Sequence, residues 1–166
     1  TTTTTTTATT TAATTTTTSA TTTTTPTTAT TATAIVTFTI ASIDSITVSG
    51  NPAAFVINSA TAGSPPTTLT DTTTTYAITT NNTARKITGA IDTAMPTGVT
   101  LSVALAAPST GTSAGTVALS TTAANLVTAI ANVAQAGLQI TYTLAATVNA
   151  APAALATRTV TYTVGP

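Results

Sequence analysis

The chain has 166 residues, of which only 4% are charged, and its three acidic and three basic side chains give a formal net charge of zero. It contains no Cys, His or Glu, which excludes disulfides, thiolate metal sites and histidine-based catalytic groups. Nucleic-acid binding needs clustered Lys and Arg, whereas here Arg85-Lys86 is a single dipeptide that we interpret as a solvated hairpin tip. The length suits one domain plus a tail.

Residues 1–34 form a low-complexity arm. They comprise Thr, Ala, one Ser and one Pro, and 25 of them are Thr. Thr is β-branched and favours extended chain, but this composition buries too little apolar area to offset the entropy of ordering. We expect a flexible spacer, an O-glycosylated stalk, or an extension that pairs with a neighbour's sheet edge.

The apolar residues do not form a membrane-spanning segment. No stretch approaches the roughly 20 consecutive apolar residues of a transmembrane helix, so no membrane span is predicted. There is no signal-peptide pattern. The chain lacks an initiating Met, and we expect a mature, processed form, in keeping with an extracellular or cell-surface location. A nearly uncharged, Thr-rich surface suits a protein that assembles or carries glycans.

The pattern changes at Ile35. Val36, Phe38 and Ile40 alternate with Thr and predict a half-buried strand. Ile46 and Val48 repeat this alternation before a turn. Residues 73–92 predict a hairpin, because the Asn81-Asn82-Thr83 turn separates two alternating runs.

The second half alternates more clearly. Strands are predicted over 99–105, 117–119, 138–144 and 160–164. Residues 122–137 fit either a helix capped by Gly137 or a strand, and we favour a strand followed by a short helical turn. About nine short strands in all predict an all-β fold, an antiparallel immunoglobulin-like β-sandwich over 35–166 with an extended N-terminal Thr/Ala-rich arm over 1–34.

Few residues can carry chemistry. The candidate acids and bases are Asp44, Asp71, Asp92 and Lys86. The three Asp residues are far apart in sequence and form no calcium loop. We expect Asp44 and Asp71 to bond nearby backbone, and Asp92 to pair across strands with Arg85 or Lys86. The sequence therefore predicts a protein that is not an enzyme and has no catalytic residues, cofactor or metal.

Two features relate to sugars. Asn81-Asn82-Thr83 is an N-glycosylation sequon at a predicted exposed tip, so Asn81 is a candidate glycosylation site. A sugar-binding site usually offers aromatic platforms, but Trp is absent, and Tyr76, Tyr142 and Tyr162 follow an inward-facing alternation. Ice binding by the Thr tract would need regular spacing, whereas the Thr runs are irregular.

The closing segment Arg158-Thr-Val-Thr-Tyr-Thr-Val164, which follows Leu138–Val148, resembles the closing strands of secreted β-sandwich fibre subunits. The similar families are spore-coat-U-like and chaperone–usher-like pilins and Thr-rich prokaryotic surface filaments with immunoglobulin-like subunits. Many such pilins carry a disulfide, which this chain lacks. The resemblance implies donor-strand assembly, in which an N-terminal extension of one subunit completes the sheet of the next.

This resemblance gives the functional expectation. We expect a structural subunit of an extracellular filament, a homopolymer assembled head-to-tail, with residues 27–40 donated and Val36, Phe38 and Ile40 as interface anchors. Two alternatives stay open. In the first, residues 35–40 are the first strand of their own domain, and the Thr/Ala arm alone reaches the neighbour. In the second, the protein is an adhesin or carbohydrate-binding domain on a glycosylated Thr-rich stalk.

Overall fold

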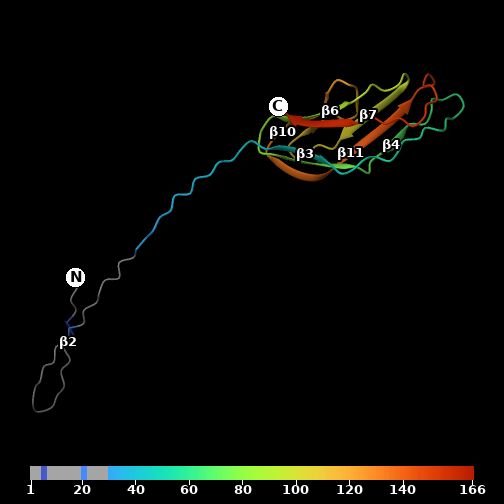
Figure 1. The fold of residues 1–166 in the computed structure, drawn as a ribbon. Coiled ribbons are helices and arrows are strands. Elements are labelled where there is room, and N and C mark those ends of the chain that lie inside the picture. Colours follow the sequence, from blue (N-terminus) through green and yellow to red (C-terminus); the bar gives the residue numbers. More distant parts are fainter. Residues whose placement is uncertain (1–4, 7–19, 22–29) are drawn as a thin grey trace, which may run out of the picture. The chain divides into compact units, whose positions relative to one another are not determined.

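The computed structural model describes residues 5–6, 20–21 and 30–166, in two units, Thr1–Thr39 and Ile40–Pro166. In the first unit, β1 (Thr5–Thr6) pairs antiparallel with β2 (Ala20–Thr21). Most of the predicted low-complexity arm lies outside the described residues. The second unit holds the remaining strands (Figure 1). It also contains the hydrophobic core.

Residues 40–166 form two antiparallel sheets. One has the strand order β12-β6-β10-β8, and the other has the order β3-β5-β11-β7-β9 with β4 also paired to β11. The ten strands are β3 (Asp44–Val48), β4 (Leu69–Asp71), β5 (Thr75–Thr80), β6 (Arg85–Ile91), β7 (Val99–Leu105), β8 (Thr112–Ser113), β9 (Val117–Ala118), β10 (Ala124–Ile130), β11 (Val133–Ala146) and β12 (Val160–Gly165).

One core lies between the sheets. Alternate residues of β5, β7 and β11 in one sheet and of β6 in the other are buried, as expected where two sheets share an apolar interior. The fully buried side chains include Ile78 and Val103 from one sheet and Ile87 and Leu126 from the other. The prediction of an all-β antiparallel fold is confirmed, and its two-layer character is sandwich-like.

The predicted hairpin over 73–92 is wrong. β5 pairs with β3 and β11, whereas β6 pairs with β10 and β12, so the two strands belong to different sheets. The connection through Asn81 and Asn82 crosses from one layer to the other, with Ala84 at a positive φ of 56°. Both strands bury apolar side chains in the same core from opposite sides, whereas the two strands of a hairpin would lie on the same side of the core.

Arg85 and Lys86 consequently begin β6 rather than forming a solvated hairpin tip. Both side chains are half-buried.

The ambiguous segment 122–137 contains strand β10, and the predicted helical turn after it is wrong. Two register shifts in the pairing of β10 with β6 place the neighbours Leu126 and Val127 both in the core. Ala129 has a positive φ of 57° in the second irregularity. These bulges produce the helix-like spacing of buried residues, because each bulge interrupts the two-residue period of a strand.

Candidate interaction site

The predicted strand at residues 35–40 does not form in the structure. These residues belong to no strand, and their apolar side chains face solvent, with Ile35 94%, Val36 80%, Phe38 81% and Ile40 75% exposed. Isolated exposed apolar residues are ordinary, but several together mark an interaction surface. The 35–40 segment is therefore an uncovered apolar feature of this chain.

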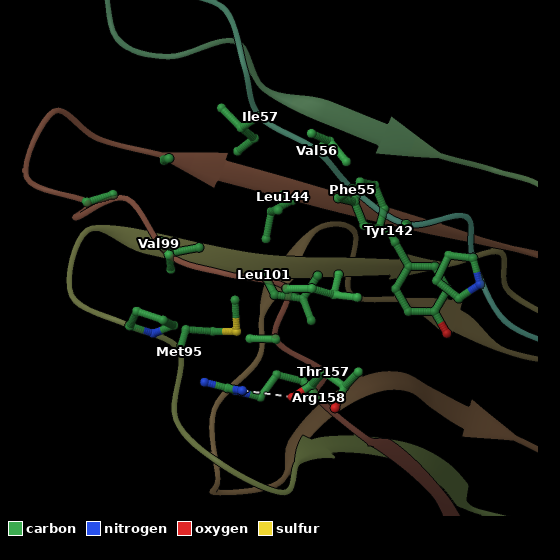
Figure 2. Close-up of a pocket in the computed structure, with 18 of the residues that line it drawn as sticks. Phe55, Val56, Ile57, Met95, Val99, Leu101, Tyr142, Leu144, Thr157 and Arg158 are labelled. Carbon is green, nitrogen blue, oxygen red and sulfur yellow. Dashed lines mark hydrogen bonds between the residues drawn. The ribbon is translucent and has the colours of Figure 1, made fainter.

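A second apolar feature is a groove within residues 40–166. It has a volume of about 1390 Å³, and its lining includes Phe55, Met95, Leu101, Tyr142 and Leu144 (Figure 2). Leu101 and Tyr142 are 8% and 4% exposed, so the groove reaches the edge of the hydrophobic core. It is an incompletely filled part of the apolar interior that opens to solvent.

Strands form the floor of the apolar groove. β7 contributes Val99 and Leu101, β11 contributes Tyr142 and Leu144, and β12 contributes Val160 from the other sheet. These positions alternate along their strands, so their side chains lie on the inner faces of the sheets. The groove consequently lies between the two layers.

Two segments without strands form the rims. Residues 50–60 and 150–159 both line the groove, and neither contains a named strand. The second rim begins Ala150-Ala151-Pro152-Ala153-Ala154, whose small side chains fill little space and whose Pro cannot donate a backbone hydrogen bond. Val56 and Leu155 are exposed on the two rims. The small side chains at the start of the second rim thus leave part of the groove unfilled.

The two tyrosine hydroxyls and the one guanidinium of the groove are paired. The Tyr162 hydroxyl donates to the Tyr142 hydroxyl at 2.9 Å, and burial raises the pKa of both phenols. Both hydroxyls therefore stay protonated and uncharged near neutral pH. Arg158, at the rim, donates through Nε and Nη2 to the Ala94 carbonyl at 3.3 and 3.1 Å and through Nη1 to the Thr157 carbonyl at 2.7 Å. The groove is accordingly apolar in character, with its one cation bonded to main chain.

A hydrogen-bond network holds the start of β3, next to the 35–40 segment. The Asn81 side chain accepts from the Ile43 N–H at 2.8 Å and donates to the Ala41 carbonyl at 2.8 Å. Asn82 Nδ2 donates to the Ser42 hydroxyl at 2.9 Å and to the Ile43 carbonyl at 3.1 Å. We call this set, residues 41–44 with Asn81 and Asn82, the asparagine clamp.

An ion pair extends the asparagine clamp. Arg85 Nε lies 3.0 Å from Asp44 Oδ2, and the Thr80 hydroxyl donates to Asp44 Oδ1 at 2.6 Å. Hydrogen bonds from Thr80 and then Asn82, together with the charge of Arg85, hold the pKa of Asp44 below its ordinary value of 3.8. The predicted pairing of Asp92 with Arg85 or Lys86 is therefore wrong, and so is the predicted backbone role of Asp44, whose partners are all side chains.

The other two Asp residues have backbone roles. Asp71 Oδ1 accepts from the Thr73 N–H at 3.0 Å, as predicted for an Asp near a strand. Asp92 Oδ1 accepts from the Thr159 N–H at 3.0 Å and so ties β6 to the start of β12. Within the part of the chain that the structure describes, no three acidic side chains gather as metal ligands would.

The structure separates the predicted site residues into two places. Val36, Phe38 and Ile40 share the exposed 35–40 segment, whereas Asn81 is an exposed member of the asparagine clamp. Glycosylation of Asn81 stays a prediction, and its Nδ2 already donates to Ala41. Sequence reasoning missed the apolar groove. The available signal was a pair of apolar, alternation-free stretches, Phe55-Val56-Ile57 and the Ala/Pro run at 150–154.

Comparisons with protein-family models, with curated proteins and with solved structures found no match to this chain. None of residues 5–6, 20–21 and 30–166 lies in a helix long and apolar enough to cross a membrane. The fold and the site therefore define an all-β, sandwich-like protein with an exposed apolar segment and an open apolar groove.

Proposed function

We propose that this protein is a structural subunit of an extracellular filament or pilus, with an immunoglobulin-like sandwich, and that each subunit donates an N-terminal strand to its neighbour. The observation that carries this proposal is the 35–40 segment. Its apolar side chains Val36, Phe38 and Ile40 alternate with Thr, yet they are exposed and the segment pairs with no strand. This is the pattern of a strand whose sheet is supplied by another molecule.

The sheets support this proposal because they have unpaired edges. β3 and β12 are terminal strands of their sheets and present unpaired backbone groups. An added strand gains main-chain hydrogen bonds there, while its alternate side chains set the register. Because the donated segment and the accepting surface are different parts of the chain, the contact is heterologous. A heterologous contact that does not close into a ring generates a filament.

The proposal extends to what the protein does not do. With Asp44, Asp71 and Asp92 all occupied by structural hydrogen bonds, we propose that the chain is not an enzyme and needs no cofactor. Its low charge supports a surface location in which copies associate rather than repel. Partners are thus copies of itself, with glycans on the Thr-rich arm or at Asn81 as an additional proposal.

The alternative is an adhesin or carbohydrate-binding domain on a glycosylated stalk. Tyr142 and Tyr162 line the apolar groove, but their hydroxyls bond to each other, and Tyr142 is buried. Sugar platforms require accessible aromatic faces. A saturable signal for this chain on a glycan array would favour the alternative over the filament.

The test of the filament proposal is negative-stain electron microscopy of the full chain beside two triple variants. Val36→Ser, Phe38→Ser and Ile40→Ser together remove the apolar face, and Thr37→Ser, Thr39→Ser and Thr33→Ser form the matched control. We expect filaments from the natural chain and the control, and dispersed particles from the first variant. Equal filament formation by the apolar-face variant, or no assembly in any sample, would overturn the proposal.

A further inference from the structure

We infer that the apolar groove is the receptor for the 35–40 segment of a second copy of this chain. This inference rests on the proposed function and assigns the accepting surface to the groove, which β12 helps to line, rather than to the edge of β3. It assigns the groove floor, made by β7, β11 and β12, to the apolar face of the incoming segment. The rims at 50–60 and 150–159 are assigned to its backbone.

The groove floor matches the apolar face of the 35–40 segment in chemistry. The floor offers Leu101, Leu144 and Val160, and the incoming face offers one Val, one Phe and one Ile. The tyrosine hydroxyls bond to each other, and Arg158 at the rim already donates to two main-chain carbonyls, so neither group needs a polar partner from the incoming segment. The groove floor and the incoming face are both uncharged and apolar, so their association is driven by removal of apolar area from water.

The groove also has the size and shape to hold an extended segment. The groove volume of about 1390 Å³ exceeds the roughly 300–1,000 Å³ of small-molecule pockets. Alternate side chains of a strand are roughly 6.6 Å apart, so Val36 to Ile40 spans roughly 13 Å. A groove lined by three strands and two rim segments suits such an extended ligand. As the middle anchor, Phe38 is assigned to the floor beside Leu101 and Tyr142.

The 150–159 rim carries backbone N–H groups that no hydrogen bond in the described part of the chain uses. Among the hydrogen bonds of the described residues, none has the backbone N–H of residue 151 or of residues 153–157 as its donor, and Pro152 has no N–H. This seven-residue stretch lies along the groove and ends just before β12. An incoming strand placed beside it satisfies these donors, as strand addition does at a sheet edge.

The asparagine clamp indicates that the occupant comes from a second copy rather than from the chain's own 35–40 segment. The asparagine clamp fixes Ala41 and Ile43 at the start of β3, where β3 pairs with the end of β5. The groove begins near Val48, at the opposite end of the five-residue β3. Because the clamp holds residues 41–43, the chain's own 35–40 segment could reach the groove only by folding back within its own six residues. The clamp therefore favours donation to a neighbour.

The test is disulfide trapping between singly substituted full chains, because the natural chain has no Cys. Thr37→Cys is placed in the 35–40 segment between its anchors, and Leu155→Cys is placed on the exposed rim. The two variants are mixed, allowed to assemble and oxidised. The matched control replaces the rim variant with Thr116→Cys, an exposed position outside the groove.

We expect a 37–155 heterodimer at least 10-fold more abundant than the 37–116 product, which would support the groove as receptor. Filaments with equal yields of the two products would overturn the groove assignment while leaving the filament function standing. Absence of filaments together with absence of trapping would overturn both. A Thr37→Cys and Leu155→Cys double variant that closes within one monomer would overturn the second-copy assignment in favour of the chain's own segment.

Discussion

At the scale of single residues, the same residue types serve opposite purposes in two parts of this chain. Ile78 is 1% exposed in the core, whereas Phe38 is 81% exposed in the 35–40 segment. Truncating a buried Ile removes contacts and leaves a cavity, whereas truncating an exposed side chain in the monomer removes almost nothing. Stability measurements therefore separate residues that serve the fold from residues that serve assembly.

Ile78→Ala is expected to lower the free energy of unfolding by about 2–5 kcal/mol, and Phe38→Ala to change it by less than about 0.5 kcal/mol. Urea unfolding of dilute, unassembled protein measures both. Thr39→Ala, on the opposite face from Phe38, is the control for the segment. A large loss of stability for Phe38→Ala would mean that the side chain packs within its own subunit.

Asp44 gives the chain a predictable response to acid. Its carboxylate accepts hydrogen bonds from Thr80 and Asn82 and pairs with Arg85, which lowers its pKa in the folded state below 3.8. Because the folded pKa is the lower one, the stabilisation is present above the unfolded pKa and is lost as pH falls through the folded pKa.

We expect the natural chain to be more stable than Asp44→Asn at pH 7, and the difference to shrink below about pH 4. Thermal unfolding of both proteins between pH 2 and pH 7 measures this. Asp71 also has a lowered pKa, through its bonds to Thr73, and titrates in both proteins alike. A stability difference that does not vary with pH would rule out a contribution from the charge of Asp44.

At the scale of elements, the turn beneath the groove depends on a glycine. Gly98 has a φ of 81°, and a Cβ there would lie 2.6 Å from the Ala150 backbone nitrogen. The Gly98 carbonyl accepts from the Thr147 N–H at 2.7 Å, which joins the start of β7 to the end of β11. The turn thus brings the base of the 150–159 rim close to the groove floor.

Gly98→Ala is expected to destabilise the fold by more than about 1 kcal/mol, because it combines an unfavourable φ with a close backbone contact. Gly115→Ala is the matched control, since Gly115 also has a positive φ of 74° but nothing within 4 Å of an added Cβ. Chemical unfolding of the two variants measures the difference. Equal losses would show that the contact with Ala150 relaxes without cost.

Much of each element was predictable from the sequence. The alternation in β7 and β11 gave their inward faces, because a strand buried on one side must repeat every two residues. Which strands pair was harder to predict from the sequence, because nothing in the Asn81-Asn82-Thr83 turn distinguishes a hairpin from a connection between the two sheets. The helix-like spacing around Leu126 and Val127 came from bulges, which depend on tertiary packing.

The candidate site was likewise predictable from the sequence only in part. Val36, Phe38 and Ile40 could be identified from alternation, but that pattern is identical for a strand in its own sheet and one offered to a neighbour. Their exposure required the structure. The only sequence signal for the groove was the two apolar stretches without alternation, at 55–57 and 150–154, because the groove arises where the rims at 50–60 and 150–159 fail to fill the space between two sheets.

At the scale of the whole molecule, association is expected to be apolar rather than ionic. The chain has a net charge of zero, and the 35–40 segment and the groove floor are uncharged. Salt screens interactions between exposed charges but has little effect on apolar burial.

The critical concentration for assembly is therefore expected to change less than about threefold between 0.05 and 0.5 M NaCl, a range over which screening of charges becomes strong. Light scattering against protein concentration measures it. Sodium sulfate, which strengthens apolar association, serves as a positive control and should lower the critical concentration. A steep increase with NaCl would instead indicate assembly through charged groups.

The central claim, directional donation of the N-terminal segment, is tested most directly by chain termination. A chain lacking residues 1–40 keeps the groove but has no segment to donate, so it should add to one end of a growing filament and stop growth there. We predict that mean filament length in electron micrographs falls as the proportion of this chain rises, and that the chain forms no filaments by itself. Unchanged filament length, or filaments of the truncated chain alone, would contradict the account.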